Sequence, residues 1–338
     1  MANKWSLSPE EKQSILASVK KKVTQKKRQR RIVLYLTGAA AAAITLLFML
    51  VSGIKNSSSM PTDSDNLLSQ ANETITNNTD IRLVLADDKT IAFEHDADIQ
   101  YDEKGEIIAT SGDEQIKNTT NKTDEITYHT LIVPKGKRSS LTLADGTKAW
   151  VNSGSSLKFP SSFQTDKREI WVEGEVYLDV KKNKAQPFYV NTSRMMINVI
   201  GTSFNIMAYP EDTEQSVVLV EGSVEVVTSQ EKTRLSPNQM LSMKGAGLSV
   251  REINVYDYIS WKDGYLRFSD EPLVNIMIRL SRYYDIPIEC EENTGAIKCD
   301  GKLVLFDDIA NVFKTIYHTA PIQYTIQEDK IIVSRRDK

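Results

Sequence analysis

An uncharged stretch from Ile32 to Ile54 constrains this chain more than any other feature of its sequence. As a helix rising about 1.5 Å per residue, it spans roughly 34 Å, enough to cross the hydrocarbon core of a bilayer. One isolated segment in lipid must be helical, because only then are its backbone hydrogen bonds satisfied within the segment. The sequence therefore predicts a transmembrane helix over residues 32–54, with the remaining chain divided between two sides of a membrane.

The charges around this segment predict its orientation. Residues 1–31 contain ten Lys and Arg but only two Glu, a net charge of +8, while the whole chain carries −3, which leaves −11 for residues 32–338. The positive-inside bias then predicts a single-pass inner-membrane protein with a cytoplasmic N-terminus and periplasmic C-terminal domains. A cleaved signal peptide ending near Val51-Ser52-Gly53 is the alternative, but its apolar region would be shorter.

Residues 1–31 are predicted to form one basic cytoplasmic helix. Ser8-Pro9-Glu10-Glu11 provides an N-cap serine, a first-turn proline and a capping-box glutamate. Its apolar residues then occur at helical spacing and form a narrow stripe: Ile15, Leu16, Val19 and Val23. The helix either rests on anionic lipid headgroups, which the residues alone favour slightly, or binds a cytoplasmic partner through this stripe.

Beyond the membrane segment, residues 55–80 are rich in Ser, Asn, Thr and Asp and predict a flexible periplasmic linker. From Ile81 the apolar residues alternate with period two, which predicts a β-hairpin module over residues 81–128. A similar strand–turn–strand unit recurs around Asp145-Gly146, and short alternating runs with glycines at their ends continue to Ile253. This pattern predicts an all-β domain, a β-solenoid or sandwich, over residues 129–255.

After Trp261 the pattern predicts a small α+β domain over residues 261–336. The first helix is expected to be capped by Ser269-Asp270-Glu271-Pro272, and a second helix is expected to start at Asp307. The inward residues of the two helices are Leu273, Ile276, Met277, Leu280, Ile309, Val312, Phe313 and Ile316. The expected strands are 286–290, 297–304, 322–326 and 330–334.

The only two cysteines, Cys290 and Cys299, lie near the ends of two of these expected strands. If the strands pair, their Cβ atoms approach disulfide distance, and an oxidising periplasm would permit the bond. Two free buried thiols are the alternative. The sequence favours a disulfide slightly.

Nothing in the sequence predicts catalysis. The histidines His95, His129 and His318 are not at metal-ligand spacing, and no nucleophile elbow or phosphate-binding glycine loop is present. Glu173 and Glu175 flank a glycine, yet no other feature supports a glycosidase pair there. We therefore expect no enzyme activity, no metal and no cofactor, and the lack of a basic block beyond residue 31 predicts no direct nucleic-acid binding.

A series of motifs in the large β region resembles a known family, the FecR-type membrane anti-sigma regulators of Gram-negative bacteria. The motifs are 141–147 (LTLADGT), 150–157 (WVNSGSSL), 172–180 (VEGEVYLDV), 187–190 (PFYV), 200–206 (IGTSFNI) and 220–226 (VEGSVEV). The part from Trp261 through 265–268 (YLRF) and 280–284 (LSRYY) to 331–333 (IIV) is similar to the short N-terminal domains of secretins and TonB-dependent receptors.

The resemblance implies a transmembrane signalling role. In such proteins the periplasmic body, a twisted β-solenoid and a small α+β domain, senses the signalling domain of an outer-membrane TonB-dependent receptor. The cytoplasmic end binds an extracytoplasmic-function sigma factor and releases or activates it. Two features depart from the family: only about one helix precedes the membrane segment instead of several, and Asn238 stands where glycine is usual. Asn is the next-best residue for a left-handed turn, so the fold is not threatened.

A membrane-tethered β-solenoid that binds an envelope glycan or has a structural role, without sigma control, is the alternative function. A stripe of exposed aromatic side chains would favour it, and the candidates are Trp150, Trp171 and Tyr177. Such residues are more often part of the core. An envelope hydrolase ranks below both, because no catalytic constellation supports it.

Overall fold

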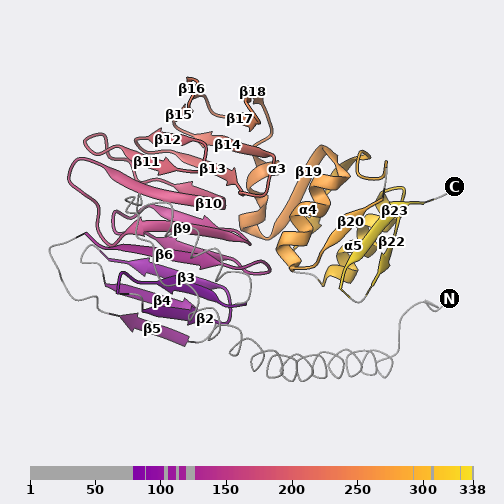
Figure 1. Cartoon of the computed structure of the whole chain (residues 1–338), viewed down its shortest axis with the longest axis horizontal. Coiled ribbons are helices and arrows are strands. Elements are labelled where there is room, and N and C mark those ends of the chain that lie inside the picture. The colour runs from indigo at the N-terminus through magenta and orange to yellow at the C-terminus, as the bar shows by residue number, and fades with distance from the viewer. Residues whose placement is uncertain are drawn as a thin grey trace, which may run out of the picture. The chain divides into compact units, whose positions relative to one another are not determined.

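The computed structural model describes residues 79–336, apart from residues 88, 103–105, 112–113, 119–125, 292, 306–307 and 328. The predicted cytoplasmic helix (1–31), the transmembrane helix (32–54) and nearly all of the linker (55–80) lie outside the described residues. In the part of the chain that is described, no helix is long and apolar enough to cross a bilayer. That part forms a large, mostly-β domain with a curled sheet and a small C-terminal α+β region (Figure 1).

The β domain confirms both strand–turn–strand units expected from the sequence. β1 pairs antiparallel with β2, and β7 pairs antiparallel with β8 across a turn at Gly146. β1 also pairs with β6, so the segment 81–128 and the segment 129–255 contribute to one continuous stack of strands. The strands of this domain are β1 (Ile81–Val84), β2 (Thr90–Phe93), β3 (Ala97–Tyr101), β4 (Ile107–Ser111), β5 (Glu114–Asn118), β6 (Tyr128–Val133), β7 (Ser139–Thr142), β8 (Lys148–Val151), β9 (Ser155–Pro160), β10 (Arg168–Asp179), β11 (Phe188–Asn191), β12 (Met196–Val199), β13 (Ser203–Ala208), β14 (Glu214–Glu221), β15 (Val224–Val227), β16 (Lys232–Leu235), β17 (Gln239–Lys244) and β18 (Gly247–Glu252).

The sheet curls into two layers, and strand β10 belongs to both. Its first part pairs with β9 and β11 in layer one, and its second part pairs with β8 and β13 in layer two. The strand changes layer at Gly174, whose φ is +90° and whose Cα faces Ser155 so closely that an added Cβ would lie 2.7 Å from the Ser155 Cα. Only glycine combines this backbone conformation with this approach, so the bend is encoded at a single residue.

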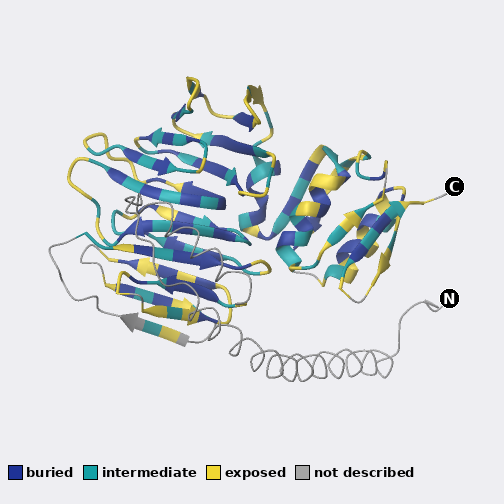
Figure 2. Ribbon diagram, in the orientation of Figure 1, coloured by how far each residue is buried: buried dark blue, intermediate teal, exposed yellow. Residues whose placement is uncertain are grey.

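One apolar core fills the space between the layers. The shared face expected for Val176, Leu178 and Val180 is confirmed, because all three are buried in this core, whereas Tyr177 packs with the core of the α+β region. Layer one adds side chains such as Leu157 and Ile197, and layer two adds Phe204 and Leu241. Figure 2 shows the buried positions alternating with partly exposed ones along the strands, as expected when one face of each strand is turned inward.

A buried ion pair links the turn between β7 and β8 to the strand that curls. Arg168, which is 1% exposed, donates to a carboxylate oxygen of Asp145 at 2.7 Å and to the backbone carbonyls of Gln186, Lys181 and Ile200. Asp145 also accepts from the backbone and hydroxyl of Thr147, which is the local turn role expected for it. The longer-range role has no signature in the sequence. The guanidinium thus donates hydrogen bonds to acceptors in three separate loop segments.

The α+β region contains the two expected helices. Their inward residues are confirmed, since Leu273, Ile276 and Leu280 are buried on the first helix and Val312 and Phe313 on the second. The elements are α3 (Tyr256–Ile259), η1 (Ser260–Asp263), β19 (Tyr265–Pro272), α4 (Leu273–Tyr284), β20 (Ile288–Cys290), β21 (Lys298–Val304), α5 (Ile309–Thr319), β22 (Ile322–Ile326) and β23 (Ile331–Arg335).

Of two local expectations concerning turns and caps, one is wrong and one is confirmed. The predicted cap around Ser269 is wrong: β19 runs through to Pro272, and α4 starts at Leu273 without a side-chain cap, because residues 271–272 pair with β21. Asn238 does adopt the left-handed conformation expected for it, with φ +67°. The second helix is capped by Asp308, whose carboxylate accepts from the backbone of Ala310.

Candidate functional site

The partner-binding stripe predicted from the sequence concerns four residues that lie outside the described part of the chain: Ile15, Leu16, Val19 and Val23. Their role stays a prediction.

The strand pairing on which the Cys290–Cys299 disulfide depended is wrong, and both cysteines are free thiols in the structure. Cys290 lies on β20, which pairs with β23, whereas Cys299 lies on β21, which pairs with β19. Partial burial raises the pKa of both thiols, which disfavours the reactive thiolate. The two residues therefore act as small packing side chains beside the core of the α+β region.

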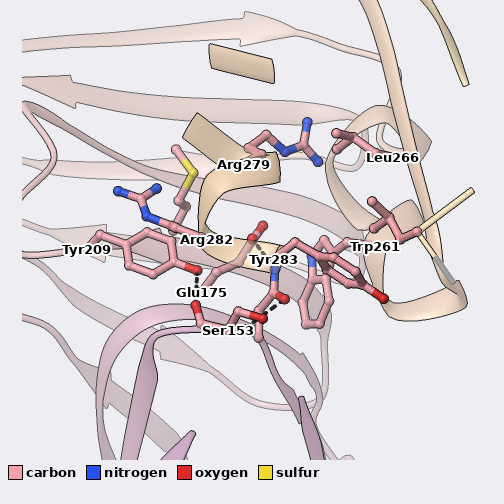
Figure 3. A pocket seen from close by; sticks show the side chains of 11 residues that line it. Ser153, Glu175, Tyr209, Trp261, Leu266, Arg279, Arg282 and Tyr283 are labelled. Carbon is pink, nitrogen blue, oxygen red and sulfur yellow. Dashed lines mark hydrogen bonds between the residues drawn. The ribbon is translucent and has the colours of Figure 1, made fainter. Parts of the chain in front are cut away.

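The structure brings polar residues of both regions together where the β domain contacts α4 and η1 (Figure 3). We call this cluster the junction and define it by seven residues: Asn152, Glu175, Asn205, Tyr209, Trp261, Arg279 and Arg282. The first four belong to the β domain, and the last three to η1 and α4. The junction is our candidate functional site.

The centre of the junction is the side chain of Glu175, which is only 6% exposed. One carboxylate oxygen accepts from the Asn152 amide at 2.7 Å, and the other accepts from the Asn205 amide at 3.0 Å. The amide oxygen of Asn205 in turn accepts from the indole N–H of Trp261 at 3.3 Å. Both oxygens of the buried carboxyl group are thereby satisfied, as a buried charge requires.

The charge on Glu175 is balanced from the other region. Burial raises the pKa of the Glu175 carboxyl group, while the positive charge of Arg279 and the amide hydrogen bonds of Asn205 and Asn152 oppose that rise. Arg279 lies on α4 and also lines the cavity at this site. Moving α4 away would therefore remove the positive charge that opposes the effect of burial on this carboxyl group.

A second contact is made by Arg282, the other α4 cation, which is buried. Its guanidinium pairs with the carboxylates of Asp212 and Glu211 in the turn between β13 and β14, and it stacks 3.8 Å from the ring centre of Tyr209. The Tyr209 hydroxyl is buried and donates to the Ser153 carbonyl at 2.9 Å, a bond drawn in Figure 3. Burial raises the pKa of Tyr209, so this hydroxyl stays protonated.

Two further bonds reach the backbone of the α+β region from the turn before β7. The Gly136 N–H donates to the Arg282 carbonyl at 3.0 Å, and the Arg138 guanidinium donates to the Trp261 carbonyl at 3.1 Å. Arg138 also lies 5.0 Å from the ring centre of Tyr283. The two regions thus meet through backbone, ionic and aromatic contacts together.

The cavity enclosed by these residues measures about 20 Å³, which is room for about one water molecule and for no larger ligand. The junction holds a fully hydrogen-bonded carboxylate and two cations, but no nucleophile with a neighbouring base. In the described ranges, no group of three His, Cys, Asp or Glu residues is placed to hold a metal ion. What the arrangement can do is hold the two regions together, through the Trp261–Asn205 hydrogen bond and the ion pairs of Arg282.

Sequence reasoning does not find this site, although most of its residues lie in the motifs quoted above. The sequence pairs Glu175 only with Glu173, and the structure places these two in different layers: Glu173 pairs opposite Ser156 and Glu175 opposite Met207. The available signal is the pair of glutamates that flanks the glycine at the bend, and it does not say which of the two is buried. Its partners cannot be read from spacing.

The three aromatic residues considered for glycan binding do not form one stripe. Tyr177 is buried and packs edge-on against Trp150, with Lys262 over both rings, in layer two. Trp171 instead packs against Tyr128 on layer one. No single surface presents all three.

Comparison with known proteins places these features in context. Residues 129–225 match the family model described as FecR protein, and residues 265–333 match the model described as FecR, C-terminal. No curated protein matches the chain.

Two crystal structures of a proposed anti-sigma factor from Parabacteroides distasonis are similar to the chain. One is 26% identical, with a TM-score of 0.58, and covers 62% of this chain and 100% of its own. The other is 27% identical, with a TM-score of 0.57, and covers 62% of this chain and 99% of its own.

Proposed function

This chain belongs to the FecR-type family of anti-sigma factors, and on that premise we propose that it regulates a sigma factor across the inner membrane. In this proposal an extracytoplasmic-function sigma factor binds the cytoplasmic end. The signalling domain of an outer-membrane TonB-dependent receptor binds the periplasmic end, and the single membrane helix connects the two. No catalytic step is part of the mechanism.

The observation that carries the proposal is the match to both parts of a FecR-type regulator in their order along the chain. The junction supports a relay between those parts, because Asn205, a motif residue of the first part that also donates to Glu175, accepts a hydrogen bond from Trp261 ahead of the second. A receptor that displaced α4 would have to break the ion pairs of Arg282 with Asp212 and Glu211 and its contact with the Tyr209 ring. Binding at the C-terminal region would then be felt in the β domain.

The receptor contact is proposed to lie on the edges of the small sheets in the α+β region. β22 is an outer strand of the three-stranded sheet, and its last residue, Ile326, is 57% exposed. An exposed strand edge presents unpaired backbone groups to which an extended segment of a partner adds as a further strand. The change Ile326→Lys should therefore weaken receptor binding, and Val250→Lys, on the exposed strand β18, is the matched control.

The sigma-factor contact is tested by in-cell photo-crosslinking. A photoreactive amino acid replaces Leu16 or, separately, Val19, and captured proteins are identified by mass spectrometry. Capture of a sigma factor is the expected result. Capture of lipid alone would reduce the first helix to an anchor and remove the inner half of the proposal.

The receptor contact is tested with the full chain in non-ionic detergent and a purified receptor signalling domain. Binding is expected at both low and moderate salt, and its absence under both conditions would contradict the outer half of the proposal. Deleting residues 1–31 while keeping the membrane segment separates regulation from the alternative structural or glycan-binding role. A structural protein should tolerate this deletion, whereas a regulator should lose control of its target genes.

A further inference from the structure

The β domain has a groove that is lined by none of the residues of the α+β region. This groove has no role in the proposed function. It is an open depression of about 460 Å³ where three chain segments meet: the β10–β11 loop, the β12–β13 corner and the β14–β15 corner. We call it the basic groove, and it is lined by Lys182, Lys184, Asn198, Val199, Ile200, Gly201, Thr202, Gly222, Ser223, Glu225 and Arg234.

We propose that the basic groove binds an extended acidic peptide segment of a protein partner. Four features of the groove carry this inference: its cations, an unsatisfied amide, an exposed apolar side chain and the rigidity of its floor.

Positive charge gathers here on an otherwise acidic molecule. Three of the lining side chains are Lys or Arg and one is Glu, whereas the chain beyond the membrane segment carries −11. Arg234 pairs loosely with Glu225 at 3.4 Å, but no described carboxylate lies within ion-pair distance of Lys182 or Lys184. The acidic surface around the groove repels an anionic partner, whereas the cations of the groove attract it. The contrast directs such a partner to this site and orients it during approach.

An unsatisfied acceptor lies in the same groove. The side-chain oxygen Oδ1 of Asn198 is buried and has no hydrogen-bond partner among the described residues. A buried polar atom without a partner costs free energy, so a ligand that donates to it gains more than it would at a solvated atom. The backbone N–H of an extended peptide is a donor of the required kind, and the Asn198 amide N–H offers the peptide carbonyl a partner in return.

The apolar component of the groove favours a peptide over a sugar. Ile200 is 46% exposed, one of the larger apolar side chains left open on the surface. None of the lining residues carries an aromatic ring on which a sugar could stack. An apolar peptide side chain next to Asp or Glu would cover Ile200 while its neighbours pair with the lysines.

The lysines are presented by a loop that is tied down rather than loose. Val180 and Asn183 donate backbone hydrogen bonds to the carbonyls of Thr202 and Ile200, at 3.0 and 2.9 Å, on either side of Lys182. Gly201 lies so near this loop that an added Cβ would come within 2.5 Å of the Lys182 Cα. The Thr202 hydroxyl then joins the next corner by donating to the Ser223 carbonyl at 3.1 Å. Pre-ordering of this kind lowers the entropic cost of binding.

The test measures binding of a fluorescent synthetic peptide, Gly-Asp-Leu-Glu-Val-Asp-Leu-Gly, to the full chain in non-ionic detergent. A second peptide with Asn and Gln in place of Asp and Glu is the neutral control. We expect the acidic peptide alone to bind, with affinity falling by about tenfold or more between about 20 and 150 mM salt.

Variants then assign the binding to the groove. Lys182→Glu with Lys184→Glu should abolish detectable binding, and Asn198→Ala should weaken it by about tenfold without changing the salt dependence. The matched control is Lys232→Glu with Lys244→Glu, which makes the same change in net charge at exposed positions outside the groove. Circular dichroism of each variant establishes that the fold is retained.

Three outcomes would overturn the proposal. The acidic peptide fails to bind the wild-type chain at low salt, or the control variant loses binding as fully as the groove variant. The third is that polygalacturonate, an acidic glycan, binds at the groove while the peptide does not.

Discussion

In the junction, the guanidinium of Arg282 lies 3.8 Å from the centre of the Tyr209 ring, while the same cation pairs with the carboxylates of Asp212 and Glu211. One side chain of α4 is therefore held by aromatic and ionic contacts to the β domain. Because Arg282 is buried, these contacts are not screened as surface pairs are. Attachment of the α+β region should depend strongly on this residue.

Arg282→Met tests that attachment. Removing one partner of a buried ion pair typically costs about 3 kcal/mol of stability. The loss expected here is smaller, because Glu211 is half-exposed. We expect faster amide hydrogen exchange in α4 and in the β13–β14 turn, measured by mass spectrometry. Arg335→Met, at an exposed position of β23, is the control and should leave exchange unchanged. Equal protection in both variants would contradict the role assigned to Arg282.

Gly174→Ala should be severely destabilising. The added Cβ would overlap Ser155, 2.7 Å from its Cα, and the backbone would remain at φ +90°, so we expect a loss of about 3 kcal/mol or more in the free energy of unfolding. Gly245→Ala makes the same chemical change at φ +57° with no atom within 4 Å of the new Cβ, and should cost only about 1 kcal/mol. Urea unfolding measures both. Similar losses would show that crowding at the bend is unimportant.

Arg168→Met should also be strongly destabilising. It leaves the Asp145 carboxylate and three backbone carbonyls without their donor in a buried site, a loss of about 3–5 kcal/mol. Arg234→Met removes an ion pair whose Arg side chain is 81% exposed, and should change stability by less than about 1 kcal/mol. If thermal unfolding shows the same loss of stability in both variants, the buried ion pair does not stabilise these loops.

Acid should weaken the β domain through His129. This residue is 1% exposed, its Nδ1 lies 2.6 Å from the Tyr101 hydroxyl, and burial lowers its pKa to about 4. A lowered pKa means that the folded state binds its proton less readily than the unfolded state. The contribution of neutral His129 to the free energy of unfolding is therefore fully present above about pH 6.5. It is lost as the pH falls toward 4, and the total loss is about 3 kcal/mol.

The measurement is the free energy of unfolding between pH 7 and pH 4, compared with the double variant Tyr101→Phe, His129→Leu. Carboxylates titrate in both proteins, so the difference between the two curves isolates the histidine. The curves should converge on acidification. Parallel curves throughout this range would rule out His129 as an acid-sensitive group.

Local pattern is enough to predict most of the elements. Period-two alternation locates β1, β2 and β10, and helical spacing identifies the buried faces of α4 and α5, because these depend on which residues of one segment share a face. The left-handed turn at Asn238 depends equally on local backbone chemistry. The cap predicted at Ser269 is wrong because pairing of β19 with β21, a contact made elsewhere in the chain, extends the strand.

The sequence alone also determined the uncharged segment 32–54, the charge asymmetry on its two sides and the motifs of a FecR-type protein. The tertiary structure decided the junction and the basic groove, and it showed that the strands of Cys290 and Cys299 do not pair. The physical reason is the same in each case. Glu175 meets Asn152 and Asn205, and Asn205 meets Trp261, only because the sheet curls at Gly174 and the α+β region packs against the β domain. No spacing along the chain encodes such a meeting.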